Sequence, residues 1–178
     1  DAAAQAIADA IPPDHVTFSP ATTGRVNVFA ACNGLFRADR SVVDRLNRLD
    51  PAVTLACLRD HADVKAGDMV ATIKIIPLAA PGAAVSAAVD ILTEASPFEV
   101  KPYSALKVGL VATQLPSLKP SVMDKTAHLL KARLAASQSR LSRELRVPHR
   151  AEAVEDAIVS LLPDHDLVVV FGASAMTD

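Results

Sequence analysis

The sequence predicts an α/β chain in which a small α+β module precedes a parallel, doubly wound sheet. Up to about residue 103 the apolar residues form many short strand-like runs, joined by turns and interrupted by short helical patterns. After that point the order becomes β-α-β-α-β, which is typical of a parallel sheet with helices on its faces. We therefore expect domains at 1–103 and 104–178, with the joint at Lys101–Tyr103.

The first domain is expected to contain short elements bounded by turn residues. Asn33-Gly34 is a hairpin signal between two strand-like runs, so the flanking strands should pair. Ser41 stands where a helix cap belongs, directly before an apolar face. The expected elements are a helix at 2–11, strands at 24–30 and 34–37, a helix at 41–49, a strand at 52–58, a turn at 66–68 and a strand within 64–77, a helix at 84–93 and a strand at 98–103.

The second domain is expected to form a three-stranded parallel sheet. Strands at 106–112 and 167–171 should be parallel neighbours, because crossover connections between parallel strands are right-handed. The intervening elements should be a helix at 121–136, a strand at about 139–146 and a helix at 151–162. The first of these helices should turn the following side chains toward the sheet: Val122, Leu129, Leu130, Ala132 and Leu134.

Composition and charge exclude several classes of protein. A hydrophobic content of 51% is ample for a packed core, and a net charge of −2 argues against a nucleic-acid partner. The longest apolar tract, 70–89, contains Lys74 and two prolines, so we expect no transmembrane span. The Ala-rich start carries Asp1 and Asp9 and no basic region, unlike a signal peptide. We therefore expect a cytoplasmic protein.

The cysteines and histidines form no recognisable metal motif. Cys32 and Cys57 are the only cysteines, and their spacing is not CxxC, so we expect reduced, unpaired and buried thiols. The five histidines form neither HxH nor HExxH, which argues against a zinc site. The chain lacks an initiator Met and stops directly after a loop that should lead into another helix, so we expect a piece of a longer protein.

Two loops should open at the same edge of the parallel sheet. Thr113 and Gln114 end the first strand, and Gly172-Ala173-Ser174 follows the last one. Ligands bind at this edge in open α/β sheets, and small residues let backbone amides close on a phosphate or carboxylate. The same small residues also suit a tight strand-to-helix turn. The segment matches neither a P-loop, nor GxGxxG, nor GxSxG.

Ser121 and Asp124 open the helix that follows the first loop, and two interpretations of them remain. Their Ser-x-x-Asp spacing is that of a capping box, in which the side chains satisfy the first amides of the helix. Alternatively, Asp124 faces the cleft and holds a magnesium ion or orients a substrate group.

The stretch from 119 to 150 holds eight basic residues and two acidic ones in a net-negative chain. Most of this charge should form a solvated helix face, although Lys119 and Lys125 could attract an anionic ligand to the loop. His149, next to Pro148, is either a cleft residue or a structural one.

Three stretches resemble motifs of the molybdopterin-binding fold, which molybdopterin adenylyltransferase, molybdopterin molybdotransferase and the competence-damage-inducible family share. KVGLVATQ resembles the family's first strand, and Asp124-Lys125-Thr126 stands where a D-[ST]-[NT] element opens the first helix. VVVFGASAMTD stands where the family has a T-G-G-x-[SG] turn with an Asp downstream. Residues 112–126 and the FGASA stretch are similar to those of a bacterial branch of molybdopterin-binding proteins.

The resemblance covers about residues 104–178 and implies a protein that binds molybdopterin or the molybdenum cofactor in cofactor biosynthesis or delivery. It implies molybdopterin nucleotidyl or molybdate transfer, with magnesium, as the reaction if the protein is an enzyme. Implied partners are a pterin ligand, a molybdoenzyme and further copies of the chain. The implied site consists of Thr113, Gln114, Ser121, Gly172, Ala173 and Ser174 around the anionic group, with Asp124 and Asp178 as catalytic residues and Asp124 also as the metal ligand.

Two alternatives belong to other functional classes. One is a non-catalytic carrier or assembly partner that hands the cofactor to a molybdoenzyme. The other is a nucleotide-acting enzyme similar to the competence-damage-inducible family.

Overall fold

The computed structural model describes residues 1–174 and shows two compact units, Asp1–Tyr103 and Ser104–Asp178. The division lies where the hydrophobic period of the sequence changes. Within the described residues the chain is a mixed α/β protein with five α-helices and ten strands. No helix among these residues is both long enough and apolar enough to cross a membrane.

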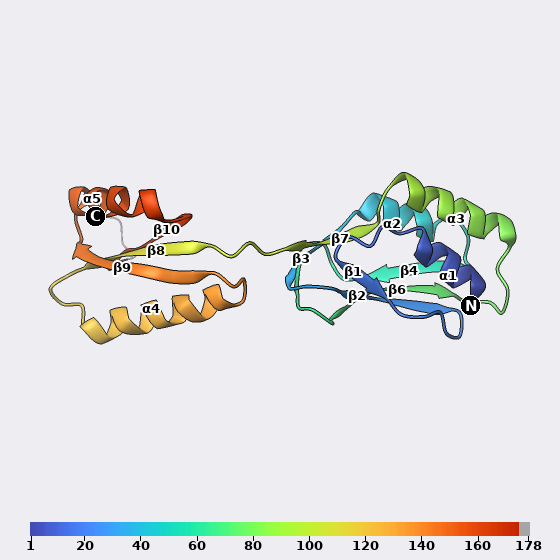
Figure 1. Ribbon diagram of the computed structural model, residues 1–178, viewed down its shortest axis with the longest axis horizontal. Helices are drawn as coiled ribbons and strands as arrows, with labels where there is room; N and C mark the ends of the chain where they lie inside the picture. The colour runs from blue at the N-terminus through green and yellow to red at the C-terminus, as the bar shows by residue number, and fades with distance from the viewer. Residues whose placement is uncertain (175–178) are drawn as a thin grey trace. The chain divides into compact units, whose positions relative to one another are not determined.

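The first unit contains two antiparallel sheets and three helices. One sheet has the strand order β1-β2-β6-β4, and the other has the order β5-β3-β7. The helices pack on the four-stranded sheet (Figure 1). The elements are α1 (Ala2–Asp9), β1 (Val16–Phe18), β2 (Arg25–Ala30), β3 (Gly34–Ala38), α2 (Arg40–Asn47), β4 (Val53–Cys57), β5 (Ala62–Val64), β6 (Met69–Ile75), α3 (Gly82–Glu94) and β7 (Phe98–Pro102).

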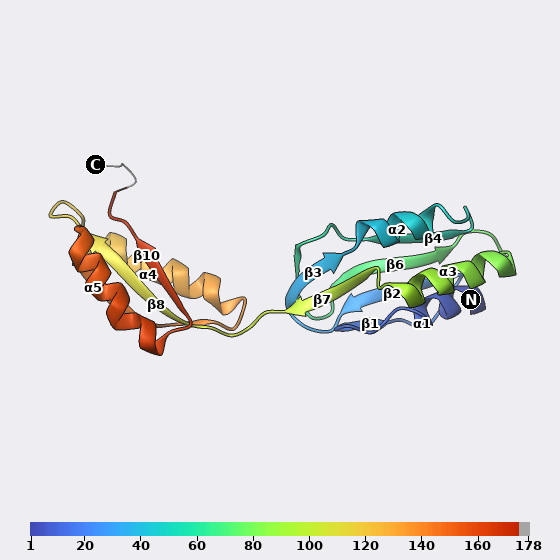
Figure 2. The ribbon, with the colours of Figure 1, turned by 90° about the horizontal axis from the view of Figure 1, so that it is seen from above.

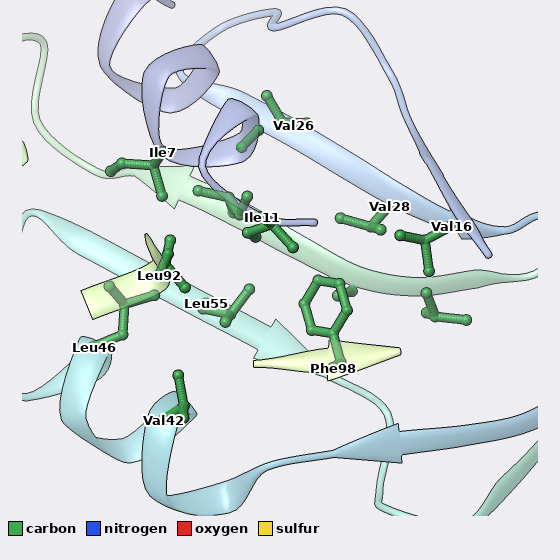
Figure 3. Packing of buried hydrophobic residues seen from close by; sticks show 14 of the residues in the cluster. Ile7, Ile11, Val16, Val26, Val28, Val42, Leu46, Leu55, Leu92 and Phe98 are labelled. Carbon is green, nitrogen blue, oxygen red and sulfur yellow. The ribbon is translucent and has the colours of Figure 1, made fainter. Parts of the chain in front are cut away.

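A single hydrophobic core, mainly of aliphatic side chains, holds this unit together. Figure 3 shows Ile7, Leu46 and Leu92, one from each helix, gathered with Leu55 of β4, and all four side chains are buried. Burying side chains of this size stabilises a fold by about 1.5–3 kcal/mol each. Phe98 of β7 also enters this cluster, so the three-stranded sheet shares the core with the helices.

The hairpin expected at Asn33-Gly34 is wrong, because β2 and β3 belong to different sheets. Gly34 is the first residue of β3, opposite Pro102 of β7, and a Cβ atom there would come within 2.3 Å of the carbonyl oxygen of Lys101. The glycine is therefore required by the close approach of two strands and not by a turn.

The cap expected at Ser41 is also wrong, because Asp39 caps α2. The Asp39 carboxylate accepts hydrogen bonds from the backbone amides of Ser41 (2.8 Å) and Val42 (3.3 Å) and from the Ser41 hydroxyl (2.6 Å). These bonds, that of the Ser41 hydroxyl first, hold the pKa of Asp39 below its ordinary value. Ser41 thus supports the cap instead of forming it.

The second unit is a three-stranded parallel sheet with the order β10-β8-β9, which confirms that 106–112 and 167–171 are parallel neighbours. Its elements are β8 (Lys107–Gln114), α4 (Pro120–Ala135), β9 (Arg140–Pro148), α5 (Ala151–Leu161), the short 3₁₀ helix η1 (Leu162–Asp164) and β10 (Leu167–Phe171). The helices α4 and α5 cover opposite faces of the sheet (Figures 1 and 2). The central strand β8 is accordingly buried on both faces.

A bulge in β9 changes the face on which its apolar residues lie. Val108 pairs with Leu141, but Gly109 pairs with Arg143, so Ser142 is the extra residue. Leu141 consequently packs on the α4 side, whereas Leu145 and Val147 pack on the α5 side. Without the bulge, these three odd-numbered residues would share one face.

The apolar face expected for the first helix of this unit is partly wrong. Met123 and Ala127 are the buried residues of α4, with Leu130 partly buried behind them. Val122, Leu129 and Ala132 are exposed. The helix begins at Pro120, and residues 123, 127 and 130 face the sheet. Large apolar residues at neighbouring positions suggested a different face in the sequence.

Cys32 and Cys57 are both free thiols, as expected, although each is half-buried and not fully buried. Burial raises the pKa of the Cys57 thiol, which makes it less reactive at neutral pH.

Candidate functional site

The carboxyl ends of the three parallel strands meet at one edge of the second unit. Thr113 lies opposite Val147, and Gln114 lies opposite Pro148, so the loop after β9 begins beside the end of β8. The backbone amide of His149 donates to the carbonyl of Gln114 at 3.1 Å. The loop after β10 starts at the same edge, because Phe171 lies opposite Ala112.

Thr113 is the centre of this edge. Its side chain is a buried polar group, with the residue only 3% exposed. The Thr113 Oγ1 atom accepts a hydrogen bond from the amide of Ala173 (2.6 Å) and lies 2.8 Å from His149 Nδ1 and 3.4 Å from the Phe171 carbonyl oxygen. One hydroxyl therefore fixes the loops after β9 and β10 against the central strand.

Two depressions flank this cluster, and Thr113 and Gly172 line both. The larger, of about 600 Å³, lies along α5 and the end of β10. The smaller, of about 120 Å³, lies on the α4 side and is mostly apolar. The larger depression is lined by Thr113, His149, Arg150, Ala151, Val154, Glu155, Ile158, Val159, Val170 and Gly172.

The structure brings together three residues that the sequence assigned to the site: Thr113, Gly172 and Ala173. Ser174 follows them in the same loop. Gln114 points toward α4, where its side-chain amide lies 3.6 Å from the sulfur of Met123. Asp178 lies outside the described residues.

Of the two interpretations of Ser121 and Asp124, the capping box is wrong. Lys119 is the N-cap residue of α4, Pro120 follows in the first turn, and no side chain caps the helix. Ser121 and Lys125 are exposed positions of the helix and line neither depression.

Asp124 forms an ion pair across to β9. Its Oδ1 atom lies 2.6 Å from Arg146 Nη2, and Arg146 Nε lies 2.6 Å from Glu144 Oε1. The hydrogen bonds of Glu144 and then Asp124 raise the pKa of the Arg146 guanidinium, so the cation is permanent. Arg146 thus pairs with one oxygen of the carboxylate that was expected to hold a magnesium ion.

The surroundings of Asp124 bear on the expected magnesium ion. Within residues 1–174 no three metal-ligating side chains lie together, and one oxygen of Asp124 is already bound to Arg146. Magnesium binding by Asp124 remains a prediction, and the ion would share the carboxylate with Arg146.

His149 and Arg150 enter the site because β9 is longer than expected. The strand runs to Pro148, two residues beyond the expected end at 146, and this places His149 beside Thr113. The apolar residue Val147, after the charged run of β9, was the signal for the longer strand. Arg150 is the N-cap residue of α5, which is why it lines the depression along that helix.

The second unit is thus a parallel α/β unit with a candidate ligand-binding edge. No protein-family model, curated protein or solved structure matches the chain. The resemblance to the molybdopterin-binding fold therefore stays a prediction.

Proposed function

We propose that the protein binds molybdopterin or the molybdenum cofactor at the carboxyl edge of the parallel sheet. The observation that carries the proposal is the Thr113 cluster, which holds the two loops of the edge beside a depression of about 600 Å³. Small-molecule sites measure roughly 300–1,000 Å³ and combine apolar walls with a few polar groups. The sequence resemblance supplies the class of ligand, and the pterin and the molybdoenzyme remain proposed partners.

The chemistry of the larger depression supports an amphipathic ligand. Val154, Ile158 and Val159 of α5 form an apolar wall, which suits the flat ring of a pterin. His149 and Arg150 lie at the polar end, which suits a phosphate group. The ring and the anionic tail of one ligand would thus contact different parts of the same depression.

The test is calorimetric titration of molybdopterin into the wild-type protein and two matched variants. Val159 lines the depression and is 59% exposed, whereas Leu129 on α4 is 48% exposed and lines neither depression. We expect Val159→Asp to weaken binding at least about tenfold, because it places a charge on the apolar wall, and Leu129→Asp to leave binding unchanged. Equal affinities of all three proteins, or no binding by the wild type, would contradict the proposal.

Two further measurements separate the alternatives. Turnover of molybdopterin with MgATP would identify an adenylyltransferase-like enzyme, whereas tight binding without turnover would identify a carrier. Preference for a nucleotide over a pterin would favour an enzyme similar to the competence-damage-inducible family. Native mass spectrometry of the protein purified from its host would show the bound ligand and the oligomeric state together.

A further inference from the structure

The hydroxyl of Thr113 has three hydrogen-bonding neighbours, although it carries one hydrogen. A threonine hydroxyl donates once and accepts twice. The amide of Ala173 can only donate, so it occupies one acceptor position at 2.6 Å. The hydrogen and the second acceptor position are left for His149 Nδ1 at 2.8 Å and the Phe171 carbonyl at 3.4 Å.

Two arrangements satisfy this cluster. In the first, the Thr113 hydroxyl donates to His149 Nδ1, and the imidazole is neutral with its proton on Nε2. In the second, the hydroxyl turns to the Phe171 carbonyl, and Nδ1–H of His149 donates to Thr113. The second arrangement accommodates a ring that is protonated on both nitrogens. His149 can therefore gain a proton without leaving Nδ1 or the buried hydroxyl unsatisfied.

The other ring nitrogen of His149, Nε2, has no hydrogen-bond partner among residues 1–174. Among these residues, one side-chain nitrogen or oxygen atom is both buried and without a partner, and it is His165 Nε2. Since His149 Nε2 also has no partner there, it must be accessible to solvent. His149 itself lines the depression. Nε2 is thus open to a ligand, while Thr113 fixes the orientation of the ring through Nδ1.

The net charge of the depression depends on His149. Among residues 1–174, the charged side chains that line it are Arg150 and Glu155, from the start of α5, and neither forms an ion pair with another of these residues. Thr113 of β8 and Gly172 after β10, which also face the ring, carry no charge. The formal charges of Arg150 and Glu155 cancel, so a proton on His149 makes the depression positive.

We infer that His149 is an anion-contacting residue, whose protonated ring binds a phosphate group of the ligand through Nε2–H beside Arg150. Thr113 acts as a positioning residue, because it orients the ring in both charge states. Hydrogen bonds between ionised partners are about twice as strong as neutral ones, so protonation should raise the affinity for the anion. The inference rests on the proposed function only for the identity of the ligand as a pterin, and not for the anion contact itself.

The test uses sulfate as the probe at constant ionic strength. Sulfate keeps its charge between about pH 5.5 and about pH 8, the range in which histidines change charge, whereas phosphate monoesters gain a proton near pH 6. His149→Asn places an amide near the position of Nδ1, so it can preserve the contact with Thr113, but it removes Nε2. His128→Asn, at an exposed position of α4, is the matched control.

We expect the wild type and His128→Asn to bind sulfate about tenfold more tightly at the lower pH, and His149→Asn to lose this gain. One imidazole NMR signal, absent from His149→Asn, should shift when sulfate is added. An undiminished gain in His149→Asn, or none in the wild type, would overturn the inference.

A parallel titration with molybdopterin separates this inference from the proposed function. If sulfate behaves as expected but molybdopterin does not bind, the anion contact stands and the proposed ligand is wrong. If molybdopterin binds the wild type and His149→Asn equally at both pH values, and the sulfate gain is absent, the proposed function stands and the role of His149 is wrong.

Discussion

The ion pair between Asp124 and Arg146 provides a residue-level test of the role of this carboxylate. Asp124 is 65% exposed at its side chain and Arg146 is 29% exposed, so their attraction is screened by water. Exposed ion pairs contribute at most about 1 kcal/mol to stability. We therefore expect Asp124→Asn to change the melting temperature only slightly and to leave molybdopterin affinity unchanged, as measured by calorimetry. A tenfold or larger loss of affinity in a folded Asp124→Asn protein would show that the carboxylate contacts the ligand or its metal.

Asp39 should make the stability of the first unit depend on pH. The folded state lowers the pKa of this carboxyl from its ordinary value of 3.8. The stabilisation is therefore fully present above that value and is lost as the pH falls through the lower folded pKa. We expect Asp39→Ala to lower the melting temperature at neutral pH, because the amides of Ser41 and Val42 lose their acceptor.

The control for Asp39 is the melting temperature of the same two proteins at acid pH. The melting temperatures of wild type and Asp39→Ala should converge as the pH falls below 3.8, where the wild-type carboxyl also takes up its proton. A constant difference across this range would mean that the cap does not depend on the charge of the carboxylate.

At the scale of elements, the order of apolar segments in the sequence predicted the parallel sheet. It did not predict contacts between residues on neighbouring strands. The β-α-β-α-β order and the apolar run of β10 were enough to place β8 beside β10. The role of Gly34 could not be predicted, because it depends on the carbonyl of Lys101, which is distant in sequence. Thr113 and Ala173 were expected at the edge, whereas the contact of Thr113 with His149 depends on the register between β8 and β9.

The bulge in β9 allows a direct test of that register. Deleting Ser142 would remove the extra residue and force either the preceding or the following part of β9 onto the wrong face. We expect the deletion to unfold the second unit or to reduce its stability strongly, as measured by circular dichroism and thermal unfolding. Ser142→Ala keeps the chain length and loses only a 3.3 Å hydrogen bond to Val108, so it should be mild. Similar stabilities of the two variants would show that β9 can slide past β8.

At the scale of the whole molecule, the two units differ in the size of their cores. The first unit buries one large aliphatic cluster, whereas the second has two small clusters, one on each face of the sheet. We expect the second unit to open more readily, because less apolar surface is buried in each cluster. Native-state hydrogen exchange should find slower exchange at Val28 and Ile73 than at Leu110 and Val111. Equal protection would mean that the two units unfold together.

The bulge at Ser142 also constrains how sequences with this unit can evolve. The bulge puts the apolar residues before and after it on opposite faces of the sheet. The length of β9 and the alternation of its apolar residues therefore depend on each other. A chain that lost one residue from β9 would have to shift the parity of its apolar positions on one side of the loss. A change in the length of this strand should therefore be accompanied by compensating substitutions at several positions. Single substitutions alone should leave the bulge in place.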